Sequence, residues 1–324
     1  MRYIVIGAGA VGGAIGGRLH ESGRDVVLVA RGAHGAALRE HGLRLHTPDG
    51  TRTLRIPVAS GPDEAGPRPG DVLLLTVKTQ DTDAALAAWA PAAADLPLLC
   101  VQNGVANEDL ALRRFARVYG VCVWLPAQFV EPGVVTAPCA PLTGMLHIGR
   151  HPGGEPDDTA RAIAADLEGA HFLAPVVPDV LRWKYAKLLS NLGNAVQAVC
   201  GTGDPGAAEL LRRARAEGEA VLTAAGIPYA GEAEQAALRG DRMDMRPVPG
   251  ADVGGGSTWQ SLRRGTGSVE ADWLNGEIVL IGRRHGVPAP VNEALRRAVN
   301  TFAREGRAPG SGSAAELLAA LPDA

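Results

Sequence analysis

The sequence contains no long apolar run and no cluster of basic residues, and each absence excludes a class of function. A membrane-spanning helix needs about 20 consecutive apolar residues, so no membrane association is expected. A net charge of −3 without a basic tract argues against a nucleic-acid partner. An apolar stretch begins as early as Tyr3, which leaves no space for a signal peptide before it. These absences predict a cytoplasmic protein.

Cysteine is rare and scattered. The four residues are Cys100, Cys122, Cys139 and Cys200. They form no C-x-x-C pair, and their wide spacing is typical of reduced core residues in a cytoplasmic protein. Neither a disulfide framework nor a metal site is therefore predicted.

Lysine is almost absent, because only Lys78, Lys184 and Lys187 among the 32 basic residues are lysines. A genomic bias towards arginine would produce this ratio by itself. A lysine that persists against such a bias is a candidate for proton transfer, since a lysine can lose its proton whereas an arginine stays charged. The alternative is that three surface lysines survived by chance.

Glycine, in contrast, is abundant, and three glycines near the N-terminus have the spacing G-x-G-x-x-G. The spacing alone is weak evidence in a chain with 42 glycines. Here it follows an apolar run at residues 3–6 and precedes a helical pattern and a second apolar run at 26–29. This order of strand, turn, helix and strand is typical of a dinucleotide-binding site. A glycine-rich packing turn is the alternative, and it leaves the flanking strands unexplained.

We therefore predict that a dinucleotide binds along this turn. The glycines permit a tight turn, a close approach of the pyrophosphate and close packing of helix on strand. The helix N-terminus directs free N–H groups and its positive end towards the phosphates. The predicted contacts are Gly7, Ala8, Gly9, Ala10, Val11 and Gly12.

The end of the second strand indicates which dinucleotide binds. NAD sites usually place a carboxylate there to hold the ribose 2′-OH, but here Ala30 and Arg31 occupy these positions. A guanidinium is well suited to a 2′-phosphate. We therefore predict NADP(H) as the cofactor, with a solvated surface arginine as the alternative.

Two further strands, predicted at residues 71–77 and 97–101, end in polar residues. The first is followed by Lys78, and the second by Gln102 and Asn103. Because ligands bind at the carboxyl ends of parallel strands, we expect these residues to line the cofactor cleft. A lysine on a surface loop and an ordinary Asn-Gly turn are the alternatives.

Residues 1–176 are predicted to form an α/β Rossmann domain with a doubly wound, mainly parallel sheet. Later strands of the same sheet are expected at residues 119–125 and 133–148. A hairpin is expected from residues 43–46 and 51–58.

Beyond residue 178 strand signals vanish and helical periodicity takes their place. We predict an all-α domain over residues 177–324, which is expected to carry the substrate site and to form a homodimer. Its helices are expected at 179–199, 206–225, 232–239, 268–285, 291–305 and 314–321.

The helix at 179–199 carries Lys184, Lys187, Asn191 and Asn194 at spacings of 3, 4 and 3 residues. This spacing places them on one stripe roughly 80° wide. A solvated face is one interpretation. However, asparagine is a poor residue for a helix interior, and the solvated faces of this chain are normally formed by arginine and glutamate. The stripe is therefore predicted to face a ligand.

A second candidate segment lies at residues 254–272. Its glycines suggest a mobile loop, with Ser257 at the start of a helix. Ser268 is expected to be an N-cap, which places Glu270 in the first turn of the next helix. Glu270 then either stabilises the helix dipole or orients a cationic acid across the cleft.

Together these motifs resemble those of the ketopantoate reductase (2-dehydropantoate 2-reductase) family. The matches span most of the chain, and their order and spacing are specific to the family although each motif alone is not. They are G-A-G-A-V-G at 7–12, A-R-G at 30–32, V-K-T at 77–79, Q-N-G at 102–104, K-L-L-S-N at 187–191, S-T-W-Q at 257–260 and V-E-A-D-W-L-N-G at 269–276.

The resemblance implies a function for several residues. It makes Lys187 the proton donor to the reduced carbonyl, with Glu270 paired to it or to the substrate hydroxyl. Lys78 and Asn103 would line the nicotinamide side. An ammonium near the carbonyl would stabilise and protonate the charge that hydride transfer leaves on oxygen. The substrate contacts are then expected to be Asn103, Lys187, Asn191, Asn194 and Ser257.

The sequence departs from the family pattern at the substrate residues. The family usually has a second asparagine four residues after the first, where this chain has Ala195, and Asn194 stands one residue early. A methionine and an aspartate of the segment after Ser257 are replaced by Thr258 and Ser261.

The stretch 239–256 is also longer and richer in arginine than the family pattern. One of Arg242 and Arg246 could supply an anion contact, with a solvated loop as the alternative. These changes leave the identity of the 2-oxo acid open.

The predicted function is the NADPH-dependent reduction of a 2-oxo acid, with ketopantoate as the leading substrate and (R)-pantoate as the implied product. A related reductase acting on another 2-oxo acid or on a carbonyl-bearing secondary metabolite is the first alternative. A non-catalytic NADP(H)-binding sensor is the second, and the presence of both Lys187 and Glu270 argues against it.

Overall fold

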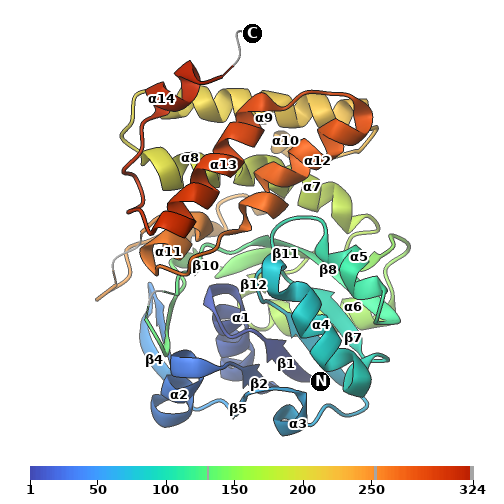
Figure 1. The fold of residues 1–324 in the computed structure, drawn as a ribbon. Helices are drawn as coiled ribbons and strands as arrows, with labels where there is room; N and C mark the ends of the chain where they lie inside the picture. Colours follow the sequence, from blue (N-terminus) through green and yellow to red (C-terminus); the bar gives the residue numbers. More distant parts are fainter. Residues whose placement is uncertain (130, 252–253, 322–324) are drawn as a thin grey trace. The chain divides into compact units, whose positions relative to one another are not determined.

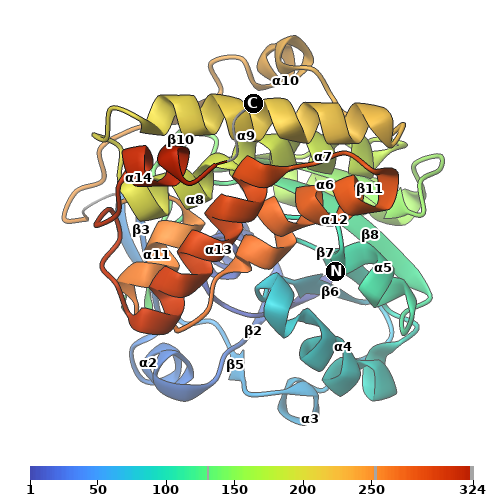
Figure 2. The ribbon, with the colours of Figure 1, turned by 45° about the horizontal axis from the view of Figure 1, so that its top comes forward.

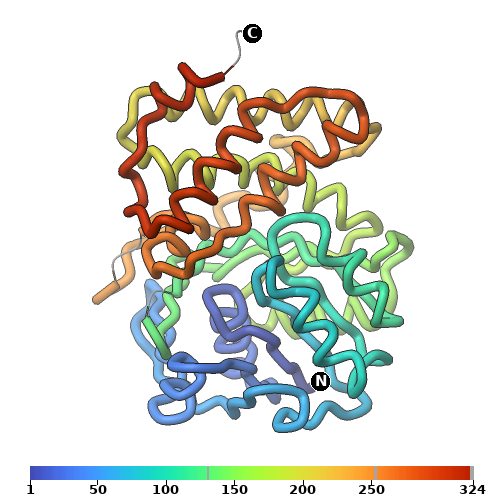
Figure 3. The backbone as a smooth tube through the Cα atoms, viewed as in Figure 1, coloured from blue at the N-terminus to red at the C-terminus, as the bar shows by residue number. Residues whose placement is uncertain are grey.

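The computed structural model describes residues 1–129, 131–251 and 254–321, and it divides into two compact units. Unit 1 contains Met1–Lys184 and Gly231–Val253, and unit 2 contains Tyr185–Ala230 and Gly254–Ala324. The division therefore falls later than residue 176, inside a helix, and the chain returns to unit 1 before it completes unit 2. Figure 3 allows the backbone to be followed through these passages by colour.

A sheet of eight strands forms the centre of unit 1 (Figure 1). Neighbouring strands are parallel except for one antiparallel pair, β8 and β11. Numbered along the chain, the first six strands of this sheet have the order 3-2-1-4-5-6, which is that of a dinucleotide-binding Rossmann fold. The predicted fold class is thus confirmed. The order in space is β12 (Phe172–Leu173), β11 (Gly144–His151), β8 (Arg117–Trp124), β7 (Pro97–Cys100), β6 (Asp71–Leu75), β1 (Arg2–Ile6), β2 (Asp25–Val29) and β5 (Val58–Ala59).

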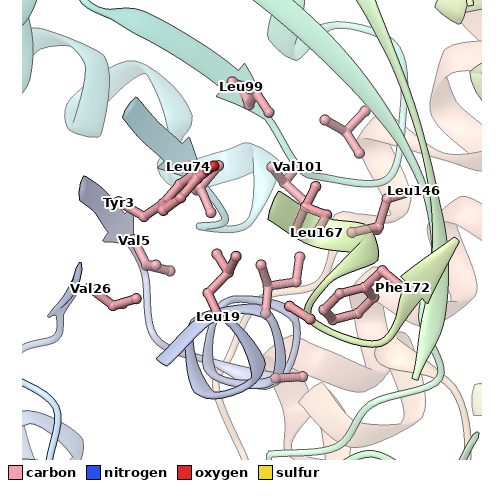
Figure 4. Close-up of a cluster of buried hydrophobic side chains, with 14 of the residues drawn as sticks. Tyr3, Val5, Leu19, Val26, Leu74, Leu99, Val101, Leu146, Leu167 and Phe172 are labelled. Atoms are coloured by element: carbon pink, nitrogen blue, oxygen red, sulfur yellow. The ribbon is translucent and has the colours of Figure 1, made fainter. Parts of the chain in front are cut away.

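Both faces of the sheet are buried under helices, because successive strand residues point to opposite faces. Tyr3 and Val5 pack with α1 and α6 in one cluster, part of which Figure 4 shows. Ile4 and Ile6 pack on the other face with α4 and α5. The helices of this unit are α1 (Ala10–Glu21), α2 (Gly32–His41), α3 (Pro62–Ala65), α4 (Thr79–Ala93), α5 (Asn107–Leu112), α6 (Asp158–Glu168) and α10 (Glu232–Arg239).

The later strands differ from the prediction of a single sheet. The stretch 133–148 contains β9 (Val134–Thr136), β10 (Cys139–Pro141) and the start of β11, and only β11 belongs to the main sheet. Strand β9 pairs with β3 (Leu43–Thr47), whose antiparallel partner is β4 (Gly50–Leu54). The predicted hairpin is therefore confirmed as far as Leu54, but Val58 lies in β5, which pairs with β2.

One strand occurs where none was expected. The three residues Met243–Met245 form β13, which pairs with β10 in unit 1. The strand is short and mostly exposed, so its sequence carries no alternating pattern. Pairing with the edge of β10 rather than local propensity accounts for it.

Unit 2 contains only helices among its described residues. They are most of α7 (Val180–Asn191), α8 (Gly193–Cys200), α9 (Ala207–Ala224), α11 (Ser257–Arg263), the 3₁₀ helix η1 (Glu270–Trp273), α12 (Asn275–His285), α13 (Pro290–Glu305) and α14 (Ala314–Ala319). Helices α12 and α13 lie side by side, and both pack against α9 (Figure 2). Within the described part of the chain, no helix is long and apolar enough to cross a membrane.

The helix predicted at 179–199 is interrupted at Leu192. Leu192 keeps helical dihedral angles, with φ of −58° and ψ of −29°. Its carbonyl accepts a hydrogen bond from Nδ2 of Asn275 at 3.2 Å. The interruption lies between an asparagine and a glycine, Asn191 and Gly193, which both favour a helix interior poorly. The predicted stripe is therefore divided between α7 and α8.

Candidate active site

The glycine turn lies where the strand order reverses, between β1 and β6. Gly7 adopts a φ of +106°, and the amides of Gly7 and Ala8 both donate to the carbonyl of Val29 at 3.1 Å. The hydroxyl of Thr76, just after β6, donates to the carbonyl of Gly7 at 2.6 Å. Ligands of open α/β sheets bind at this switch point, so the turn has the position that a dinucleotide site requires.

Gly12 and Gly9 have opposite surroundings: there is no space for a side chain at Gly12, whereas the space beside Gly9 is open. A Cβ atom at Gly12 would lie 2.2 Å from the carbonyl oxygen of Gly7, so α1 could not pack on β1 with any other residue. A Cβ atom at Gly9 would meet nothing within 4 Å. Gly9 is the N-cap of α1, which has neither a side-chain cap nor an acidic residue in its first turn. The free amides of α1 therefore fit the pyrophosphate of a dinucleotide.

Arg31 follows β2 as the exposed N-cap of α2, with an extended backbone. Within the described ranges its guanidinium makes no ion pair. The first turn of α2 contains no acidic residue. An exposed cation therefore stands at the N-terminus of a helix at this end of β2.

Lys78 and Asn103 are both half-buried, and each lies three residues after the end of a strand of the sheet. Lys78 is the N-cap of α4, and Asn103 lies in the loop between β7 and α5. The two segments are linked by Asn107, whose Nδ2 donates to the hydroxyl of Thr79 at 3.2 Å and to the carbonyl of Asn103 at 3.3 Å. Asn107 is fully buried and belongs to no recognisable motif, so no local signal in the sequence predicts this link.

Gln102 has a different position from the one expected of a ligand contact. Its side chain is buried, and Nε2 donates to the hydroxyl of Thr82 at 3.1 Å. That hydroxyl in turn donates to Oδ1 of Asn107 at 2.8 Å. The side chain therefore supports the loop, and a cofactor contact by Gln102 stays a prediction that would involve its backbone.

Lys184 is not part of a ligand-facing stripe, which corrects the interpretation of the helix at 179–199. Its ammonium forms an ion pair with the carboxylate of Glu108 at the start of α5, and the two side chains are 2 % and 0 % exposed. The preceding residue, Trp183, stacks on the imidazole of His147 with ring centroids 4.1 Å apart. Burial lowers the pKa of His147 to about 4, so the ring is neutral near pH 7. The first turn of α7 is thus anchored inside unit 1.

The remaining predicted residues belong to unit 2. Lys187 is half-buried on α7, and Asn191 is buried at its end. Glu270 is buried as the first residue of η1. The N-cap of η1 is Val269 rather than Ser268, so the capping prediction was wrong although Glu270 does lie in the first turn.

Asn194 lies close to the start of α11 within unit 2. Ser257 is the first residue of α11, as predicted. Its N-cap Gly256 has its amide bonded to Oε1 of Gln197 at 2.8 Å. A Cβ atom at Gly256 would lie 3.1 Å from Oδ1 of Asn194. Ala195 is buried beside it, with 2 % of its surface exposed.

Arg242 and Arg246, the two candidate anion contacts of the stretch 239–256, belong to unit 1. Residues 252 and 253 of that stretch lie outside the described residues. The guanidinium of Arg242 donates to the carbonyl of Leu238, and both Arg242 and Arg246 are exposed. A substrate contact by either arginine stays a prediction.

Comparison with known proteins identifies the family. The family model described as ketopantoate reductase PanE/ApbA matches residues 3–153, and the model of its C-terminal part matches residues 179–303. The chain belongs to the ketopantoate reductase family. This membership makes it an oxidoreductase that uses a pyridine nucleotide and acts on a CH–OH group or its carbonyl counterpart.

Individual relatives match over nearly the whole chain. The 2-dehydropantoate 2-reductase of Pyrococcus horikoshii is 28% identical over 91% of this chain and 95% of its own length. The corresponding protein of Archaeoglobus fulgidus is also 28% identical over the same shares. A crystal structure of a PanE/ApbA family ketopantoate reductase from Ralstonia eutropha JMP134 is 29% identical, covers 95% of this chain and 100% of that chain, and has a TM-score of 0.78.

A D-mandelate dehydrogenase has the same fold. Its ternary structure with NADH and anilino(oxo)acetate has a TM-score of 0.80 at 20% identity, over 95% of this chain and 100% of that chain. Proteins named for different 2-oxo and 2-hydroxy acids thus share this architecture, so the fold does not select the substrate.

The buried pair of Glu108 and Lys184 generates a stability prediction. Glu108→Gln should destabilise the protein by about 3–5 kcal/mol, because it leaves the ammonium of Lys184 buried without a counter-charge. The double variant Glu108→Gln with Lys184→Met should be clearly more stable than Glu108→Gln alone. Urea unfolding measures both.

The matched control is Glu234→Gln, which removes the partner of Arg182 from a more exposed ion pair that joins α10 to the first turn of α7. This pair should contribute at most about 1 kcal/mol. Equal losses for Glu108→Gln and Glu234→Gln would contradict a special role for the buried pair.

Proposed function

We propose that the protein catalyses the NADPH-dependent reduction of a 2-oxo acid to its 2-hydroxy acid, with 2-dehydropantoate as the leading substrate and (R)-pantoate as the product. The observation that carries this proposal is the match, over 95% of their length, to relatives named 2-dehydropantoate 2-reductase. The positions of several motif residues support it, since Lys78, Ser257 and Glu270 are each found at the start of a helix.

The reaction divides between two sets of residues. The bound nicotinamide would supply a hydride to the carbonyl carbon of the substrate. The amides and glycines at Gly7–Gly12 would hold the pyrophosphate, and Lys78 and Asn103 would orient the nicotinamide end. Lys187 would donate the proton to the carbonyl oxygen, because an ammonium both stabilises and neutralises the developing alkoxide. Glu270 would orient that ammonium or the hydroxyl that forms.

The substrate carboxylate needs hydrogen-bond donors rather than a further charge. Asn191 and the pair formed by Asn194 and Ser257 are proposed to supply them. The closeness of Asn194 to the start of α11 supports this assignment. Because Ala195 is buried and cannot donate a hydrogen bond, Asn194 would replace the second asparagine of the family pattern.

A second candidate substrate is another 2-oxo acid or a carbonyl-bearing secondary metabolite. The replacement of the family asparagine by Ala195 favours it, since that change alters the donors around the substrate. A non-catalytic NADP(H) sensor is less well supported, because a sensor needs no proton donor at Lys187. A homodimer is also proposed, and a related ketopantoate reductase from Staphylococcus aureus is described as dimeric.

A panel of 2-oxo acids assayed with NADPH tests the function. Ketopantoate should give the highest kcat/KM of the panel. Fast turnover of a different acid beside negligible ketopantoate turnover would favour the second candidate. NADPH binding without turnover of any carbonyl compound would favour the sensor.

Cofactor choice depends on Arg31. Arg31→Ala should raise the KM for NADPH by about tenfold or more and leave the KM for NADH nearly unchanged, because only NADPH carries the 2′-phosphate that the guanidinium would bind. Steady-state kinetics with both nucleotides measures the effect. A wild-type preference for NADH would contradict the assignment.

Proton transfer depends on Lys187. Lys187→Ala should lower kcat by at least about 10²-fold with nearly unchanged NADPH affinity. Lys187→Arg should lower kcat to a similar extent, since arginine keeps the charge but does not release a proton. A near-normal rate in either variant would remove Lys187 from the role of acid, and fluorescence titration with NADPH serves as the folding and binding control.

A further inference from the structure

His34 contacts the glycine turn although it belongs to a different element. It is the third residue of α2, and its Nε2 lies 2.7 Å from the carbonyl oxygen of Ala8. Ala8 is the residue between the first two glycines of the turn. On the other side of the ring, Nδ1 lies 3.0 Å from the backbone nitrogen of Gly133.

The two partners fix the protonation of the ring. A carbonyl oxygen can only accept, so Nε2 must carry the hydrogen that it donates to Ala8. A backbone N–H can only donate, so Nδ1 must be the acceptor for Gly133. The imidazole is therefore neutral, with its proton on Nε2, and both nitrogens are engaged.

The loop residues that contact His34 are held in place by contacts of their own. The carbonyl of Gly133 accepts from the amide of Arg44 in β3 at 2.8 Å, which ties this loop to the three-stranded sheet. The imidazole packs against the ring of Phe129 at a centroid distance of 4.4 Å. Two residues later, Val135 lies so close to Gly13 that a Cβ atom there would be 2.7 Å from Cγ2. The segment 133–135 therefore borders both His34 and the first turn of α1.

We propose that His34 is a positioning residue for the dinucleotide. It holds the Ala8 carbonyl away from the phosphate side, so that the amides following it stay directed at the pyrophosphate. An unrestrained peptide at Ala8 could turn its oxygen towards an anion, and that would oppose binding. The inference rests on the proposed use of a dinucleotide at this turn, and it assigns His34 no contact with the reacting atoms.

The same residue links the two phosphate sites of NADPH. Arg31 is the N-cap of α2, and its carbonyl accepts from the amide of Gly35 at 3.2 Å. His34 lies within this first helical turn. A hydrogen bond from His34 to Ala8 thus fixes the start of α2, with Arg31, against the glycine turn.

Two substitutions separate the two hydrogen bonds of His34. A glutamine amide reaches about as far as Nε2, so His34→Gln can keep the donor to Ala8. An asparagine amide reaches only about as far as Nδ1. His34→Asn can therefore keep the acceptor for the Gly133 amide, but it loses the hydrogen bond to the Ala8 carbonyl. We expect His34→Asn to weaken NADPH binding about fivefold to tenfold, as the loss of one hydrogen bond implies. His34→Gln should stay within about threefold of the wild type.

The binding readout is NADPH fluorescence titration, and the second readout is hydrogen exchange in the cofactor-free protein. The amides of residues 7–13 should exchange faster in His34→Asn than in the wild type and at an unchanged rate in His34→Gln. His41→Asn is the control, since His41 is exposed in the last turn of the same helix. Equal affinity of both His34 variants, or unchanged exchange in His34→Asn, would overturn the proposal.

NADH separates this inference from the proposed cofactor choice. Because the pyrophosphate is common to both nucleotides, His34→Asn should weaken the binding of NADH by the same factor as the binding of NADPH. Arg31→Ala should act on NADPH alone. If the protein prefers NADH, the Arg31 assignment fails while the His34 result stands. If His34→Asn weakens only NADPH, the residue acts through the 2′-phosphate and the proposal is wrong.

Discussion

The close approach of α1 to the end of β1 is the constraint on which the nucleotide site depends. No side chain fits at Gly12, because a Cβ atom there would overlap the Gly7 carbonyl. The same approach lets Thr76 tie β6 to that carbonyl, and it leaves the amides of α1 uncapped at the edge of the sheet. These uncapped amides, at the carboxyl end of β1, are suited to an anionic ligand.

Local sequence patterns predicted the secondary structure of residues 3–31 well. Contacts between residues far apart in the sequence were not predictable. The glycine spacing, the flanking strands and the arginine after β2 all lie within 30 residues, where periodicity and turn chemistry act directly. The contacts of Glu108 with Lys184 and of His34 with Gly133 join residues 76 and 99 positions apart. No local signal specifies such partners, and the same reason explains why 133–148 divides among three sheets.

Helical periodicity predicted that the polar residues at 184–194 form one ligand-facing stripe on a single helix. The structure shows why periodicity alone was not sufficient. Periodicity determines which residues share a face, but it does not determine what covers each turn of the face. The first turn of α7 is covered by unit 1, through Trp183 and Lys184. Asn191 and Asn194 are separated by the interruption at Leu192, whose carbonyl accepts a hydrogen bond from Asn275.

The persistence of lysine in an arginine-rich chain therefore has two physical causes on one helix. The Lys184 side chain is only 2 % exposed, and its ammonium pairs with one carboxylate. The five donors of an arginine could not all be satisfied in that space. Lys187 is half-buried three residues later, where the proposed chemistry requires a group that can release a proton. The buried ion pair and the proposed acid therefore lie three residues apart on one helix, α7.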